Sequence, residues 1–183
     1  MSHIIILNGI GSAGKSSIAR AFQTLQPTYL HVQMDAFLDM IPAASFGTPE
    51  GLVFETSESD GHPIITIRSG PLVATAMRAF RASIAAMAAD GIDLILDDVI
   101  FGPQWADYDR LRPTHRVTKI GIICPLDILE AREAARGDRA IGLARGQWHR
   151  INHQTDYALT LDSSTLTPEQ SAAAIARHLE HQP

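Results

Sequence analysis

Short apolar runs alternate along this chain with longer stretches in which apolar residues recur at helical spacing. The short runs predict strands at residues 3–7, 29–33, 93–97, 117–124 and 157–161. The longer stretches predict helices at residues 14–25, 70–90, 125–136 and 168–181. Strands separated by helices in this way are typical of a parallel sheet that helices cover on both faces.

Residues at the ends of the predicted helices agree with this pattern. Gly91 and Gly137 follow two of the helices, and glycine readily adopts the left-handed conformation that ends a helix. Thr167 precedes the last helix as a capping residue, and Pro168 fits the first helical position.

Length and composition favour one cytoplasmic domain over residues 1–183. Fifteen Lys and Arg against 20 Asp and Glu give a net charge of −5, which disfavours a nucleic-acid partner. Cys124 is the only cysteine, so no disulfide can form within the chain, and its apolar surroundings predict a buried small residue. The apolar N-terminus is short and has no basic flank, and no run approaches the roughly 20 apolar residues of a membrane span. We therefore expect no membrane partner.

One motif adds chemistry to this pattern. The segment Gly9-Ile10-Gly11-Ser12-Ala13-Gly14-Lys15-Ser16 matches G-x-x-x-x-G-K-[ST] between a predicted strand and a predicted helix. Its glycines let backbone N–H groups approach phosphate oxygens, and the helix N-terminus adds partial positive charge there. We expect Lys15 to contact the β- and γ-phosphates of ATP and Ser16 to ligate Mg²⁺. The whole expected nucleotide-binding loop is Gly9, Gly11, Ser12, Ala13, Gly14, Lys15, Ser16 and Ser17.

This motif makes the predicted α/β fold a three-layer P-loop NTPase or kinase fold, with a five-stranded, mostly parallel sheet. Residues 41–69 interrupt the strand–helix alternation, and Ser59-Asp60-Gly61 predicts a hairpin turn within them. A segment of this length inside a compact domain is functional or disordered. We interpret it as an insertion that helps to build an acceptor pocket.

Three aspartates follow predicted strands and should lie near the P-loop, because parallel strands end at the same edge of a sheet. Asp97 and Asp98 end an apolar run, and one of them is expected to hold Mg²⁺, although strand alternation allows only one to face the nucleotide. Asp35 follows the second strand, where it could take the proton of an acceptor hydroxyl or simply cap the next helix.

An arginine-rich segment follows the fourth strand. Arg132 and Arg136 lie four residues apart and therefore share a helix face, and Arg139 comes three residues later. Guanidinium groups suit phosphate because their donors form a rigid, permanently charged fork. We interpret residues 132–150 as a lid over ATP, and the alternative is a solvated face paired with Glu130 and Glu133.

The segments that carry the most specific pattern are Ile5-Ile6-Leu7-Asn8-Gly9, Ser12 to Ser16, Asp35 to Met40-Ile41-Pro42, Leu96-Asp97-Asp98-Val99, Arg132 to Arg139, and Asp156-Tyr157. Together they resemble the chloramphenicol phosphotransferases of the P-loop kinase superfamily over nearly the whole chain. The Ala-Arg-Gly-Asp-Arg run is much more selective than the P-loop alone.

The resemblance implies ATP-dependent phosphorylation of the primary hydroxyl of chloramphenicol, and it leaves open whether the role is antibiotic resistance or metabolism. It implies that Asp35 acts on that hydroxyl and that Arg132, Arg136 and Arg139 surround the phosphates, with Lys15 and Arg136 assisting catalysis. Residues 43–70 depart from the family pattern, so a different metabolic or antibiotic hydroxyl stays open as the acceptor.

Two further functions stay open: a regulatory NTPase without an acceptor, and a nucleic-acid end kinase, against which the net charge of −5 weighs. The oligomeric state is not indicated by the sequence.

Overall fold

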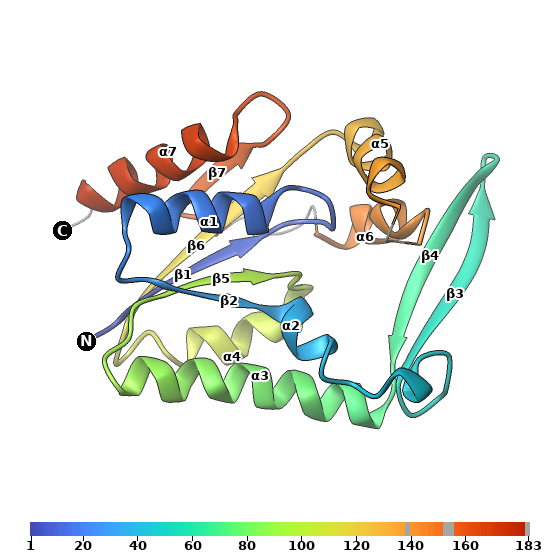
Figure 1. Cartoon of the computed structure of the whole chain (residues 1–183), viewed down its shortest axis with the longest axis horizontal. Coiled ribbons are helices and arrows are strands. Elements are labelled where there is room, and N and C mark those ends of the chain that lie inside the picture. The colour runs from blue at the N-terminus through green and yellow to red at the C-terminus, as the bar shows by residue number, and fades with distance from the viewer. Residues whose placement is uncertain (138–139, 152–155, 182–183) are drawn as a thin grey trace.

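The computed structural model describes residues 1–137, 140–151 and 156–181 and shows one central sheet between helical layers (Figure 1). The strands of this sheet are β1 (His3–Asn8), β2 (Leu30–Gln33), β5 (Leu94–Asp98), β6 (Arg116–Ile123) and β7 (Leu159–Asp162). Their spatial order is β2-β5-β1-β6-β7, and every neighbouring pair is parallel. The predicted α/β fold with a five-stranded sheet is confirmed.

Four helices lie where the sequence predicts them: α1 (Lys15–Leu25), α3 (Pro71–Ala89), α5 (Leu126–Arg136) and α7 (Pro168–Glu180). The predicted helices do not include α4 (Trp105–Asp109), α6 (Leu143–Ile151) or the 3₁₀ turns η1 (Ala43–Ser45) and η2 (Gly102–Gln104). A helix at α2 (Met34–Leu38) was raised only as the one that Asp35 could cap. Helices of five residues are too short to show a 3.6-residue repeat, and α6 contains Gly146, a poor helix former.

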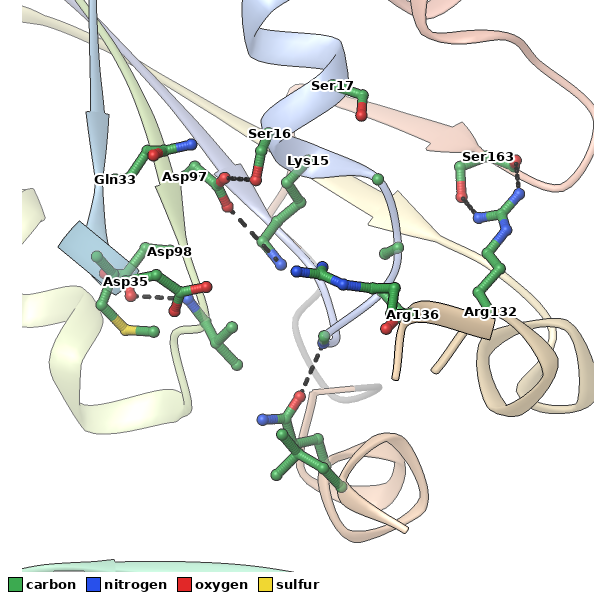
Figure 2. A pocket seen from close by; sticks show the side chains of 18 of the residues that line it. Lys15, Ser16, Ser17, Gln33, Asp35, Asp97, Asp98, Arg132, Arg136 and Ser163 are labelled. Atoms are coloured by element: carbon green, nitrogen blue, oxygen red, sulfur yellow. Dashed lines mark hydrogen bonds and ion pairs between the residues drawn. The ribbon is translucent and has the colours of Figure 1, made fainter. Parts of the chain in front are cut away.

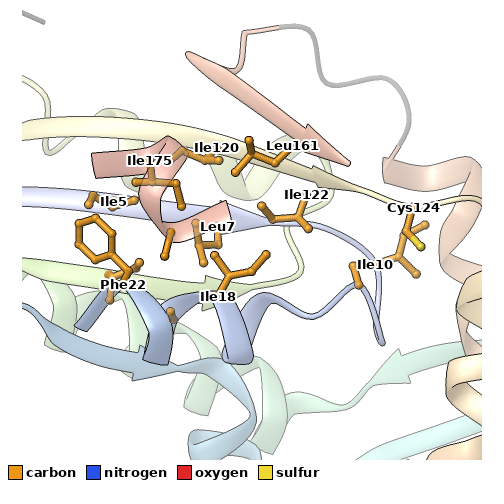
Figure 3. Close-up of a cluster of buried hydrophobic side chains, with 14 of the residues drawn as sticks. Ile5, Leu7, Ile10, Ile18, Phe22, Ile120, Ile122, Cys124, Leu161 and Ile175 are labelled. Atoms are coloured by element: carbon orange, nitrogen blue, oxygen red, sulfur yellow. The ribbon is translucent and has the colours of Figure 1, made fainter. Parts of the chain in front are cut away.

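Two apolar clusters lie on opposite faces of the sheet. Figure 3 shows the first, in which Ile18 and Phe22 of α1 and Ile175 of α7 pack against alternate residues of β1 and β6. Cys124 belongs to this cluster and is 4% exposed, as its apolar surroundings predict. The second cluster packs Phe80 and Ile84 of α3 and residues of α4 against the other face. Burial of both faces explains why the central strand β1 is a nearly continuous apolar run.

Among the described residues, only α3 has the length and mean hydropathy (1.3) of a helix that could cross a membrane. Such a helix is weak evidence, because a core helix passes the same test. Val73, Phe80, Ile84 and Ala88 of α3 are buried against other parts of the chain. We therefore interpret α3 as a layer of the fold.

The insertion forms the predicted hairpin, with β3 (Leu52–Ser59) paired antiparallel to β4 (His62–Ser69). The turn uses left-handed backbone at Asp60 (φ 53°) and Gly61 (φ 74°). In Figure 1 the hairpin rises beside α6. There the backbone N–H of Ile65 donates to the carbonyl of Gly142 at 2.9 Å, and a Cβ added to Gly146 would lie 1.9 Å from the carbonyl oxygen of Ile65. Glycine in α6 therefore lets this helix pack directly against the backbone of β4.

Candidate active site

A cleft of about 1250 Å³ lies at the carboxyl ends of β1, β2 and β5. Parallel strands end at the same edge, so segments distant in sequence meet there. The P-loop forms its floor, and α2, the β3–β4 hairpin, α5, α6 and the turn before α7 contribute the walls. Figure 2 shows the polar side chains that line it.

The P-loop turns through left-handed backbone at Ser12 (φ 67°) and Gly14 (φ 86°) before α1 begins at Lys15. The ammonium of Lys15 donates to the carbonyls of Gly9 (2.9 Å) and Ile10 (3.1 Å) and is 6% exposed. The side chain thus folds back toward the start of the loop that precedes it. This geometry brings a cation and the N-terminal amides of α1 to the same part of the cleft.

The two aspartates that end β5 have different surroundings. The Ser16 hydroxyl donates to Asp97, whose Oδ1 lies 3.9 Å from Lys15 Nζ. Asp98 is 3% exposed and accepts hydrogen bonds from the Tyr108 hydroxyl (2.6 Å) and the Val99 N–H (2.7 Å). Strand alternation directs their side chains to opposite faces. Asp97 is therefore the one in contact with the P-loop.

The pKa values of these carboxyls shift in opposite directions. Burial acts to raise the pKa of Asp97, but the contacts with His31, Lys15 and Ser16 outweigh it and leave that pKa below its ordinary value. Burial raises the pKa of Asp98, and its bonds from Tyr108 and Val99 only partly oppose this rise. Asp97 is therefore ionised at neutral pH, as a metal-binding carboxylate must be.

His31 on β2 is a residue that sequence reasoning missed. Its Nε2 lies 3.8 Å from Asp97 Oδ2, and its side chain is 8% exposed. His31 pairs in register with Ile95, two residues before Asp97 on the neighbouring strand. Residues two apart on a strand face the same side, so Ile95 and Asp97 share a face of β5. A histidine paired with Ile95 was therefore the signal in the sequence that a polar side chain lies beside Asp97.

Asp35 lies in the first turn of α2, immediately after β2. Gln33, the last residue of β2, pairs with Asp97, so the strand end brings α2 to the same edge as the P-loop. Asp35 is exposed and lines the cleft, on the other side of it from Arg136 in the view of Figure 2. The alternative that Asp35 caps this helix is wrong, because Gln33 occupies the N-cap position.

The predicted lid arginines have different positions. The guanidinium of Arg132 donates to the Ser163 hydroxyl (3.2 Å) and the Ser163 carbonyl (2.7 Å), so it fastens α5 to the turn before α7. Arg136, in the last turn of α5, lines the cleft, and its guanidinium points toward the P-loop in Figure 2. Arg139 lies outside the described residues.

The two glutamates that could have paired with these arginines have other partners. Glu130 accepts two hydrogen bonds from Arg145 (2.6 and 2.9 Å). Glu133 is 1% exposed and accepts from the backbone N–H groups of Gly142 and Ala144, both at 2.8 Å. These contacts join α5 to the start of α6.

The remaining walls of the cleft differ in polarity. Ser163, Ser164, Thr165 and Thr167 give the end beside α1 and α7 a polar lining. At the other end the lining is largely apolar, and its residues are Met34, Leu38, Phe46, Leu52, Phe54, Ile67 and Leu143. Phe46 and Phe54 are each 41% exposed, which is unusual for large aromatic side chains unless they face a ligand or a partner.

The oxygen atoms available at the carboxyl ends of the strands are suitable ligands for Mg²⁺. The Ser16 hydroxyl and the Asp97 carboxylate are hard oxygen ligands in mutual contact. Within the described ranges no group of three or more His, Cys, Asp or Glu could form a metal cage. This agrees with Mg²⁺, which is usually held by one or two protein oxygens together with nucleotide phosphates.

Residues 2–180 match the family model described as chloramphenicol phosphotransferase-like protein. The chain belongs to this family. A Mycobacterium tuberculosis (strain H37Rv) protein named "Putative O-phosphotransferase" is 33% identical over 177 residues, which cover 93% of this chain and 78% of that protein.

Solved P-loop kinases share the fold of this phosphotransferase. An unliganded sugar kinase from Janibacter sp. has a TM-score of 0.64 at 18% identity, covering 100% of this chain and 96% of that chain. The APS kinase of M. tuberculosis, solved with AMPPNP and APS, has a TM-score of 0.65 at 15% identity, covering 98% of each chain. The family match and the shared fold together make the chain a phosphotransferase of the P-loop type.

Proposed function

We propose that this phosphotransferase transfers the γ-phosphate of ATP to a hydroxyl of a small, largely apolar alcohol, and that chloramphenicol represents this class. The observation that carries the proposal is that one cleft joins the P-loop, Asp35 and an apolar wall. Nucleotide and acceptor would therefore meet between Lys15 and Asp35. The resemblance of the chain to its family supports the same acceptor class.

In the proposed reaction the acceptor oxygen attacks the γ-phosphorus in line with the β–γ bridging oxygen. The bond between that oxygen and the γ-phosphorus breaks, ADP leaves, and the hydroxyl proton passes to the Asp35 carboxylate. Lys15 holds the β- and γ-phosphates, and Arg136 faces the charge that develops on the transferred group. Mg²⁺, when bound by Ser16 and Asp97, would neutralise phosphate charge.

The apolar wall supports an alcohol with an apolar body over a polyol or an anion. Phe46 and Phe54 offer aromatic faces, and Leu38, Leu52 and Ile67 complete the surface. A sugar or a carboxylate acceptor needs several polar or cationic partners on its body, whereas an apolar ring gains free energy by leaving water against such a wall. Asp35 and Asp39 are the acids at this end of the cleft.

The test combines an acceptor panel with an Asp35→Asn variant. The wild-type protein is incubated with ATP, Mg²⁺ and either chloramphenicol, shikimate or gluconate, and the products are identified by mass. We expect a phosphorylated product with chloramphenicol and a transfer rate at least about 10²-fold lower for Asp35→Asn, the usual contribution of a general base. Affinity for ATP should not change in that variant.

Asp90→Asn is the matched control, because Asp90 caps the far end of α3 and is exposed. Release of ADP without any phosphorylated acceptor would instead support an NTPase. Transfer at full rate by Asp35→Asn would remove Asp35 from the role of base.

A further inference from the structure

Gln147 of α6 contacts the P-loop from the lid side. Its Oε1 accepts a hydrogen bond from the backbone N–H of Gly11 at 2.8 Å, and the residue is 9% exposed. Neither the P-loop pattern nor the arginine segment indicated this residue. The contact joins positions 136 residues apart in the sequence.

The direction of this hydrogen bond fixes the orientation of the Gln147 amide. A backbone N–H can only donate, so the amide must turn its oxygen to Gly11 and its NH₂ group away from it. Gln147 also lines the cleft, and among the described residues the structure gives it no second hydrogen bond. The two N–H donors of the Gln147 NH₂ group are therefore available to a ligand in the cleft.

The neighbours of Gln147 place it at the acceptor end of the P-loop. Leu143 and Gln147 are four apart on α6, share a helix face and both line the cleft. Gly142, just before α6, and Gly146 within it pack against β4 of the β3–β4 hairpin. Transfer requires the terminal phosphate to lie at this end, because the acceptor hydroxyl must reach it.

We propose that Gln147 binds the terminal phosphoryl group of ATP through its Nε2 N–H donors, while its Oε1 holds the Gly11 amide. The inference rests on the nucleotide half of the proposed function. A neutral amide anchored at one end is a fixed donor, and fixed donors stabilise charge that develops on a transferred phosphoryl group.

Two substitutions separate phosphate binding from simple bracing of the lid. Gln147→Met has a similar length but neither accepts from Gly11 nor donates. Gln147→Glu keeps an oxygen for the Gly11 N–H, but an ionised carboxylate cannot donate to phosphate. Gln23→Met is the matched control, because Gln23 Nε2 donates to the Tyr29 carbonyl (2.8 Å) outside the cleft. Gln147→Leu replaces the Met variant if that variant does not fold.

The measurement is the dissociation constant for AMPPNP relative to that for ADP, both with Mg²⁺, by calorimetry. ADP lacks the terminal group, so only a contact to that group changes the ratio. We expect both Gln147→Met and Gln147→Glu to lose about 10- to 100-fold of the preference for AMPPNP, the usual contribution of a hydrogen bond to a charged group. Gln23→Met should keep the wild-type ratio.

A ratio equal to that of the wild type in Gln147→Met would overturn the inference, even if thermal stability falls, because a brace weakens both nucleotides alike. A loss confined to Gln147→Glu would also overturn it, since charge repulsion alone explains that result. Where an acceptor is known, kcat should fall in Gln147→Met while the KM for the acceptor changes little. Wild-type binding of AMPPNP without any transfer would count against the proposed function and not against Gln147.

Discussion

The amino ends of the parallel strands form one edge of the central sheet, here called the amino edge, and their carboxyl ends form the opposite, carboxyl edge. Both edges carry polar groups of similar kinds, but these groups serve different purposes. At the amino edge the ring of His3 bonds the Tyr29 hydroxyl and the Thr118 hydroxyl, both at 2.9 Å, and its backbone N–H donates to Asp93 at 2.7 Å. At the carboxyl edge Lys15, Asp97 and Asp35 line a cleft. The amino edge closes its polar groups on one another, whereas the carboxyl edge directs them toward a space that can take a ligand.

This difference teaches that burial of a polar group does not by itself indicate function. His3 and Lys15 are 9% and 6% exposed, so their exposure does not distinguish them. His3 is surrounded by protein partners, and burial together with the charge of Arg116 lowers its pKa to about 4, although Asp93 acts in the other direction. Changes at the amino edge should therefore alter stability, and changes at the carboxyl edge should alter turnover.

The largest expected effect is at Lys15. Lys15→Ala removes the cation of the P-loop and should lower turnover by at least about 10³-fold, roughly 4 kcal/mol of transition-state stabilisation. The assay is ADP release with the acceptor identified in the panel, and thermal unfolding is measured in parallel. Near-normal kinase activity would contradict the assignment of the P-loop and remove the contrast between the edges.

The next effect is an acid sensitivity of the amino edge. The pKa of His3 is about 4 when folded and about 6.5 when unfolded, so below pH 6.5 the unfolded state binds the proton more readily. The contribution of His3 to the free energy of unfolding is fully present above about pH 6.5. It falls by up to about 3 kcal/mol as the pH drops toward 4. Urea unfolding at several pH values measures it.

His3→Gln is the comparison for this prediction, since glutamine does not titrate. The slope of unfolding free energy against pH should be smaller in the variant between pH 4 and 6.5. Equal slopes would show that His3 does not carry the acid sensitivity.

A smaller effect separates the two acids of β5. Asp97→Asn removes the charge beside Ser16, so we expect turnover to fall about 10²-fold, roughly 2.7 kcal/mol, and higher Mg²⁺ concentrations to restore part of it. Asp98→Asn should instead weaken the bonds from Tyr108 and Val99 and lower the melting temperature. Measuring activity against Mg²⁺ concentration in both variants shows which of the two aspartates binds the metal. A Mg²⁺ requirement raised only by Asp98→Asn would reverse the assignment.

The smallest effect concerns the apolar wall. Phe54→Ala removes an aromatic face from the acceptor end, and we expect the KM for an apolar acceptor to rise about tenfold, roughly 1.4 kcal/mol, with the KM for ATP unchanged. Thr56→Ala, on the same strand but outside the cleft, is the control. Steady-state kinetics with both substrates measures it. An unchanged acceptor KM would separate the hairpin from acceptor binding.

The features that have a local cause could be predicted from the order of residues alone. The P-loop is eight consecutive residues, and its glycines, lysine and flanking apolar strand specify a phosphate-binding turn without help from the rest of the chain. The strands that are buried on both faces and the long helices were also predictable, because their apolar spacing repeats over enough residues to be seen. The hairpin turn at Asp60-Gly61 belongs to the same class.

Which side chains meet across the cleft could not be predicted without the three-dimensional fold. Ser16 reaches Asp97 from 81 residues away, and Arg132 is held by Ser163 rather than turned to the P-loop. Gln147 reaches Gly11 because Gly142 and Gly146 let α6 pack on β4, and no local pattern encodes that approach. Contacts of this kind depend on how helices and strands pack in three dimensions, whereas a sequence motif reports only on neighbours along the chain.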